Sequence, residues 1–171
     1  YNPLLDTWTP TAGPLATARS LHSAVFLDGA DANPANDRVW VAGGCDASGF
    51  GIEAAEVYDP VAGTFAPAGN LAGPAVFDAA AVRLANGQAA LVGGFTRGGA
   101  FASSDPVRES LVYRLGAASA VGAQDVAARR GALRAAVIPS SGPSGSSLVI
   151  TGGFDDDGVA QDEVYVLPID D

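Results

Sequence analysis

The stretch Val39-Trp40-Val41-Ala42-Gly43-Gly44 is an apolar run that stops at a pair of glycines. It recurs as Ala90-Leu91-Val92-Gly93-Gly94 and again as Leu148-Val149-Ile150-Thr151-Gly152-Gly153. A short apolar run predicts a buried strand, and a glycine pair at its end predicts a sharp bend of the backbone. Because the pattern returns at about 50 to 60 residues, the sequence predicts a repeat architecture.

A tyrosine follows each glycine pair at the end of a second strand-like segment. The three tyrosines are Tyr58, Tyr113 and Tyr165. Seven positions after Tyr58 comes Phe65, and the chain opens on the same phrase with Tyr1 and Trp8. An Asp-Pro or Asn-Pro turn separates the two aromatic residues in both places, which predicts a hairpin. The third copy is degenerate, with Ala120 at the aromatic position.

The remaining segments complete four short strands in each repeat, so an all-β chain is expected. A further strand precedes each glycine-terminated strand, at residues 21–27, 77–82 and 133–138. Loops of different length follow the glycine pairs, at residues 45–52, 95–106 and 154–160. We interpret residues 121–133 as a loop that enters a strand. The repeats are expected at residues 1–57, 58–112 and 113–164, with a closing strand to 171, in one propeller segment over 1–171.

An apolar strand ending in Gly-Gly, then a loop, a tyrosine and a later aromatic residue, resembles the kelch repeat. The resemblance covers essentially the whole chain and is partial in the third repeat. It implies a β-propeller, whose blades are four-stranded antiparallel sheets. The expected fold is therefore three kelch-type blades, a partial or half propeller. The residues that carry the resemblance are Gly43, Gly44, Gly93, Gly94, Gly152, Gly153, Tyr58, Tyr113, Tyr165, Trp8 and Phe65.

The chain begins and ends at nearly the same phase of the repeat. Successive tyrosines, from Tyr1 onward, are separated by 57 (58 − 1), 55 (113 − 58) and 52 (165 − 113) residues. Residues 7–10 are expected to form the outermost strand of a blade, and residues 163–167 the strand that should pair with it. Three blades are fewer than the usual four to eight.

Three arrangements explain this phase. The chain is a piece of a larger propeller, which agrees with the absence of Met and hence of a start residue. Alternatively, two copies join into a six-bladed ring with two-fold symmetry. The third arrangement is an open stack of three blades covered by another protein. Open blade faces and strand edges favour association, so a protein partner or self-association is expected in each case.

Composition excludes several functional classes. There are 19 acidic and 9 basic residues, all nine of them Arg, and a net charge of −10 repels nucleic acid. No apolar run reaches the length of about 18 residues that a membrane span needs, so no membrane insertion is expected. Cys45 is the single cysteine, and a single histidine cannot build the His-rich copper centre of some kelch-type oxidases. The Lys-free, Ala- and Asp-rich composition indicates a GC-rich bacterial genome, and we expect an extracellular or periplasmic protein.

One set of polar residues recurs at a fixed spacing. His22, Asp78 and Arg134 follow one another at equal intervals, since 78 − 22 and 134 − 78 give the same value. Each is expected to begin the innermost strand of a blade. Together they would line the central channel and bind a polar or anionic small molecule. The competing interpretation is a polar ring whose members form ion pairs with each other.

Two further groups of residues lie in the predicted loops. Asp155 and Asp157 resemble the opening of a calcium loop, but the spaced acids and the terminal Glu of that motif are missing. A solvated acidic turn is the alternative, and no other cofactor is expected. Exposed loop residues can face a partner. The candidates for partner binding are Phe50, Arg97, Phe101 and Arg108.

The sequence thus favours a non-enzymatic propeller module that binds a protein or ligand through loops at one rim. No catalytic residue is assigned, and no Gly-x-Ser-x-Gly nucleophile motif is present. The alternatives are an enzyme acting on a sugar or sugar acid at the channel mouth, and a structural subunit of a larger assembly.

Overall fold

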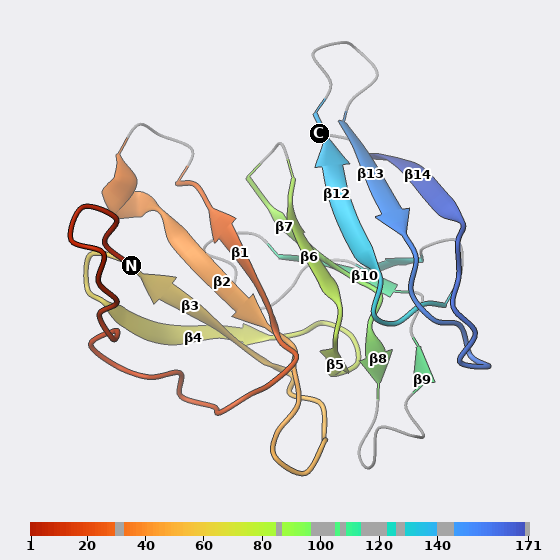
Figure 1. The fold of residues 1–171 in the computed structure, drawn as a ribbon, viewed down its shortest axis with the longest axis horizontal. Helices are drawn as coiled ribbons and strands as arrows, with labels where there is room; N and C mark the ends of the chain where they lie inside the picture. The colour runs from red at the N-terminus through yellow and green to blue at the C-terminus, as the bar shows by residue number, and fades with distance from the viewer. Residues whose placement is uncertain are drawn as a thin grey trace.

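The computed structural model describes residues 1–29, 33–84, 87–96, 105–106, 109–113, 123–125, 129–139 and 146–169. The fold is all-β and propeller-like, with every strand pairing antiparallel (Figure 1). One 3-10 turn, η1 (Pro34–Asn36), lies between the first and second strands of the chain. Within the described part of the chain no helix is long and apolar enough to cross a membrane.

Three sheets, here called blades, follow one another along the chain. Blade 1 has the order β1 (Ser23–Leu27), β2 (Arg38–Ala42), β3 (Ala54–Asp59), β4 (Thr64–Asn70). Blade 2 runs from β6 (Ala80–Arg83) through β7 (Ala89–Val92) and β10 (Glu109–Tyr113) to β11 (Ala123–Asp125). Blade 3 consists of β12 (Arg134–Ile138), β13 (Ser146–Thr151) and β14 (Val164–Ile169). A small sheet below blade 2 joins β5 (Val76–Phe77), β8 (Phe95–Thr96) and β9 (Asp105–Pro106).

The blades stand side by side, with β6 packed between β1 and β12 (Figure 1). Two apolar layers fill the spaces between them. Leu27, Trp40 and Leu91 centre the layer between blades 1 and 2, and Leu133 and Ile150 belong to the layer between blades 2 and 3. Strands that are buried on both faces must be apolar on both faces, which explains the continuous apolar runs before each glycine pair.

The glycine pairs adopt one conformation in all three blades. The first glycine has φ of +65°, +60° or +64°, and the second has φ of +91°, +100° or +94°. Such φ values strain any other residue. The bend predicted at the end of each apolar strand is therefore confirmed. At Gly44 a side chain is also excluded by contact, because a Cβ there would lie 2.6 Å from the carbonyl oxygen of Ser20.

Two predictions about strands need correction. Blade 3 has three strands among the described residues, where four were expected. The pairing expected between residues 7–10 and residues 163–167, within this chain or with another, stays a prediction, because Thr7 here forms an isolated bridge with Asn2 and β14 pairs with β13. β11 lies inside the segment 121–133 that was interpreted as a loop. Pairing with the edge of β10 compensates there for a sequence of low strand propensity.

Candidate functional site

The loops that follow the glycine pairs lie at one end of the molecule, which we call the rim. In Figure 1 the loop after β2, the small sheet β5–β8–β9 and the loop before β14 all lie at the lower end of the blades. The strands before the glycine pairs run in the same direction, so each bend delivers its loop to this end. The rim is therefore the end of the described chain at which loops from all three repeats lie.

The loops of blades 1 and 3 are built on the same turn. In blade 1, Oδ1 of Asp46 accepts the backbone N–H of Ser48 at 2.8 Å and of Phe50 at 3.0 Å. The Asp46 N–H in turn donates to the carbonyl of Phe50 at 2.9 Å. Short polar side chains stabilise turns in this way. The turn leaves Phe50 52% exposed.

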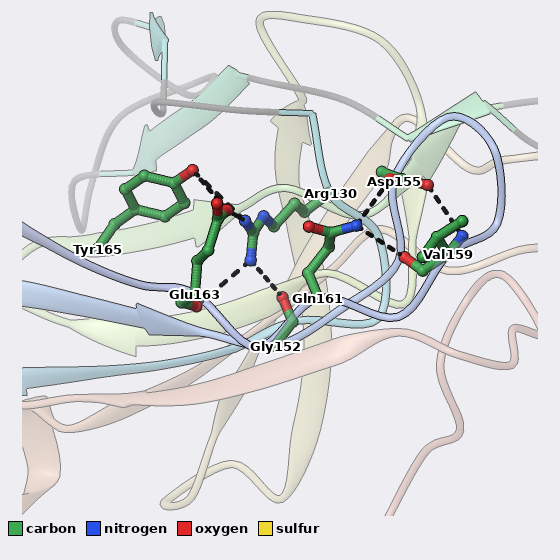
Figure 2. A network of polar contacts seen from close by, with 7 residues as sticks. All are labelled: Arg130, Gly152, Asp155, Val159, Gln161, Glu163 and Tyr165. Carbon is green, nitrogen blue, oxygen red and sulfur yellow. Dashed lines mark hydrogen bonds and ion pairs between the residues drawn. The ribbon is translucent and has the colours of Figure 1, made fainter.

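In blade 3, Asp155 takes the place of Asp46. Its Oδ1 accepts the N–H of Asp157 at 3.0 Å. Figure 2 shows that Oδ1 also accepts the N–H of Val159 at 2.9 Å and that Oδ2 accepts from Nε2 of Gln161 at 2.7 Å. Both carboxylate oxygens are thus engaged in holding the turn. Val159 is 55% exposed, as its counterpart Phe50 is in blade 1.

The calcium interpretation of Asp155 and Asp157 finds no further ligands. Among the residues that the structure describes, no group of three or more His, Cys, Asp or Glu side chains could hold a metal ion. The hydrogen bonds of Asp155 support the alternative, a solvated acidic turn.

A buried arginine clasps blade 1 just above the rim, and it was not predicted from the sequence. Nη1 of Arg19 donates to the carbonyls of Gly43 and Ala54, both at 2.9 Å. Nη2 forms an ion pair with Glu56 at 2.9 Å, with side chains 0% and 4% exposed. The second carboxylate oxygen of Glu56 accepts the N–H of Ala16 at 2.7 Å. The pair ties the incoming chain to the middle of the blade.

Arg130 makes the matching clasp in blade 3 (Figure 2). Its Nη1 donates to the carbonyls of Gly152 at 3.2 Å and Glu163 at 3.4 Å, and its Nη2 pairs with the Glu163 carboxylate. The guanidinium also lies over the ring of Tyr165, 4.9 Å from the centroid, and the Tyr165 hydroxyl donates to Glu163 at 3.0 Å.

The two clasps share a signal that the sequence does contain. Arg19 lies 24 residues before Gly43, and Arg130 lies 22 residues before Gly152. An arginine at this distance before a glycine pair therefore marks the clasp. The signal is not local, because it links a residue that precedes the innermost strand to the end of the next strand.

This clasp explains why Tyr165 is not the third copy of Tyr58. Strand pairing places Tyr58 opposite Val39, and the matching position opposite Leu148 is Leu167. Tyr165 lies two residues earlier, at the position that Glu56 holds in blade 1. There its hydroxyl accepts from Arg130 and donates to Glu163. The equivalence of Tyr165 with Tyr58 that was predicted from spacing is therefore wrong in blade 3. Tyr113, opposite Ala89 in blade 2, does share the position of Tyr58.

The equal spacing of His22, Asp78 and Arg134 does not place them at one position. Ser23, Ala80 and Arg134 are equivalent, because each lies opposite the residue before a glycine pair. Asp78 is instead equivalent to Leu21 and Ala132, and all three have positive φ of 50–54°. The blades differ in length by a few residues, so a constant spacing selects three different positions.

The structure nevertheless brings two of these residues together. Arg134 and Asp78 form an ion pair at 3.8 Å, with side chains 74% and 32% exposed. His22 lies beside Arg19 instead. Partial burial, and then the charge of Arg19, lower the pKa of His22 below 6.5, against a hydrogen bond to the Arg19 backbone that raises it. The pairing of Asp78 with Arg134 agrees with the interpretation of this region as mutual ion pairs.

Other predicted residues are placed as follows. Phe50 is exposed at the rim. Arg97, Phe101 and Arg108 lie outside the described residues. Cys45 is buried, with its Sγ 3.4 Å from the Ser20 hydroxyl.

Comparison with known proteins supports the fold and no finer assignment. No family model and no curated protein matches the sequence. The solved structure of YjhT is similar to the whole of this chain and to 49% of its own chain, with a TM-score of 0.72 and 14% sequence identity. The chain thus spans about half the length of that structure. At this identity the likeness shows a shared fold alone.

Proposed function

We propose that this chain is a non-enzymatic, kelch-type propeller module that binds a protein or ligand through its rim loops. The observation that carries the proposal is the exposure of Phe50 and Val159 on matching turns. Each apolar side chain stands at the tip of a loop whose backbone is fixed by an aspartate. Phe154, 43% exposed, extends the apolar surface of blade 3.

Rigid loops of this kind suit recognition. Ordering a flexible loop on binding costs free energy, and a preformed turn avoids that cost. Exposed aromatic side chains provide the anchors on which interfaces depend. The variable lengths of the three rim loops agree with a surface adapted to its ligand on a constant scaffold. The kelch-type assignment depends on the glycine pairs and on the hairpins of Tyr1–Trp8 and Tyr58–Phe65.

Two other functions receive less support. An enzyme for a sugar or sugar acid would need Asp78 and Arg134 free for substrate, but they pair with each other. A structural subunit remains compatible with open blade faces and differs from a binding module only in its partner. Residence outside the cytoplasm is part of the proposal and depends on composition alone.

The test is a selection of ligands from a displayed peptide library on the immobilised chain. Selected peptides should bind the double variant F50S/V159S at least about 10-fold more weakly, the loss expected when interface anchors are removed. Val61→Ser is the matched control, since Val61 is 71% exposed in the turn between β3 and β4. Equal binding of all selected peptides to the double variant and the wild type would exclude the rim.

A further inference from the structure

The rim loops of blades 1 and 3 match beyond the aspartate that holds each turn. The glycine before each exposed tip has positive φ, +82° in blade 1 and +71° in blade 3. After the tip, the N–H of Ile52 donates to the carbonyl of Gly44, and the N–H of Gln161 donates to the carbonyl of Gly153, both at 2.9 Å. The two loops therefore return to their strands in the same way, and their side chains correspond position by position.

An acidic residue stands at the same position in both loops. Glu53 follows Phe50 by three residues, and Asp162 follows Val159 by three residues. Both acids are exposed, and neither carboxylate has a hydrogen bond or an ion pair among the residues that the structure describes. Each loop thus combines an exposed apolar tip with a nearby carboxylate that the fold itself does not use.

The negative charge of the chain is concentrated at these two loops. Residues 45–53 and 154–163 make up one-ninth of its length, yet they hold seven of its 19 acidic residues and no basic residue. The seven are Asp46, Glu53, Asp155, Asp156, Asp157, Asp162 and Glu163. The rim is therefore the most acidic part of the described surface in which loops of two blades take part.

The arginines of blade 3 leave most of this charge uncompensated. Arg130 is buried in its clasp and pairs with Glu163. Arg134 is exposed but pairs with Asp78. Arg129 is the remaining exposed base in the described part of this blade. A cationic partner would therefore find unpaired carboxylates at both loops.

Backbone contacts between blades fix the two loops relative to each other. The N–H of Asp78 donates to the carbonyl of Leu21 at 2.9 Å, and the N–H of Ala132 donates to that of Asp78 at 3.2 Å. These three positive-φ residues thus link blade 1 to blade 2, and blade 2 to blade 3, through the main chain. A partner that contacts both loops meets tips and carboxylates whose spacing is already set, which avoids a cost of ordering them on binding.

We propose that the partner of the rim is a basic protein segment, in which Lys or Arg side chains lie beside apolar ones. This inference rests on the proposed function, because it names the chemistry of the partner for the same surface. The apolar side chains contact Phe50 and Val159, and the basic side chains pair with Glu53 and Asp162. Complementary charge attracts such a segment and repels acidic partners.

The peptides selected on the immobilised chain test the proposal without any change to the protein. They should contain more Lys and Arg than the unselected library. When they are resynthesised with Gln in place of every Lys and Arg, they should bind about 3- to 10-fold more weakly, the effect of a few exposed ion pairs. Binding of the original peptides should also weaken as sodium chloride rises from about 50 to 300 mM, because salt screens exposed charges.

Two variants of the chain locate the charge effect. E53Q/D162N keeps the size of both side chains and removes their charge, so the selected peptides should bind it about 3- to 10-fold more weakly. D6N/D28N is the matched control, because it removes two charges outside the rim loops and should bind like the wild type. Asp6 has φ of +50°, which Asn tolerates, and the Asp28–Arg83 pair is about one-third exposed, so this control should fold normally.

The outcomes distinguish this proposal from the function on which it rests. If F50S/V159S weakens binding and E53Q/D162N does not, the rim binds without its acids, which overturns the basic segment and leaves the proposed function standing. Equal losses in E53Q/D162N and D6N/D28N would indicate attraction by net charge alone and would also overturn it. If F50S/V159S binds like the wild type, the proposed function fails, and this inference fails with it.

Discussion

At the scale of single residues, the buried arginines determine how the chain enters a blade. The Arg19 side chain is fully buried, and four groups compensate its charge: the carbonyls of Thr17, Gly43 and Ala54, and the Glu56 carboxylate. Removal of one partner of a buried ion pair is costly, because the remaining charge stays in a medium that solvates it poorly.

Glu56→Ala should therefore lower the free energy of unfolding by about 3 to 5 kcal/mol. The measurement is urea denaturation followed by circular dichroism. Asp28→Ala is the matched control, because the Asp28–Arg83 pair is about one-third exposed on both sides. Its loss should stay below about 1 kcal/mol. Equal effects of the two substitutions would show that burial does not set the strength of the Arg19–Glu56 pair.

The sequence did not reveal residues whose role depends on contacts between distant parts of the chain. Arg19 and Glu56 are 37 residues apart, and neither belongs to a local motif. His22, Asp78 and Arg134 were grouped by counting, which assumes blades of equal length. The positive-φ positions 21, 78 and 132 differ by 57 (78 − 21) and 54 (132 − 78), so a constant count drifts by one or two positions from blade to blade.

At the scale of elements, the glycine pairs are the fixed points of the fold. Gly44 has φ of +91°, and a Cβ would meet the Ser20 carbonyl and the His22 Cβ at 2.6 and 2.9 Å. Gly158 has φ of +71° in an open turn, where a Cβ would have no neighbour within 4 Å. A substitution at Gly158 thus tests backbone strain alone, whereas one at Gly44 tests backbone strain together with steric overlap.

Gly158→Ala should lower the free energy of unfolding by about 1 to 2 kcal/mol, the cost of a left-handed residue. Gly44→Ala adds overlap with backbone atoms and should cost at least about 3 kcal/mol. Thermal and urea unfolding of both variants will measure the difference. If both lose the same free energy, the close approach of Ser20 to Gly44 has no energetic weight.

Elements encoded by local sequence were predicted well. The hairpins that begin at Tyr1 and Tyr58 share an aromatic pair and a turn held by the side chain of residue 2 or 59. Backbone N–H groups of the second turn also lower the pKa of Asp59 below 3.8, with the charge of Arg38 adding a smaller effect. β11 was missed because its place depends on the edge of β10, which the local sequence does not show.

At the scale of the whole molecule, net charge acts on any encounter between copies. The chain carries −10, so two copies repel each other at low ionic strength.

The repeat pattern of the sequence was sufficient for the all-β, propeller-like architecture, because three glycine pairs in series define where strands end. It was not sufficient for the candidate site. Phe50 was recognised as a loop residue, but its match with Val159 requires the shared aspartate turn, which only the hydrogen bonds reveal.

The backbone contacts between positive-φ residues have a consequence for how such a molecule can evolve. Leu21, Asp78 and Ala132 are chemically unrelated, yet they make the same main-chain link from one blade to the next. A substitution at any of these three positions therefore leaves the main-chain link in place. The side chains that must stay matched between blades are those of the two apolar layers. This freedom offers a physical reason why a shared architecture survives at 14% sequence identity.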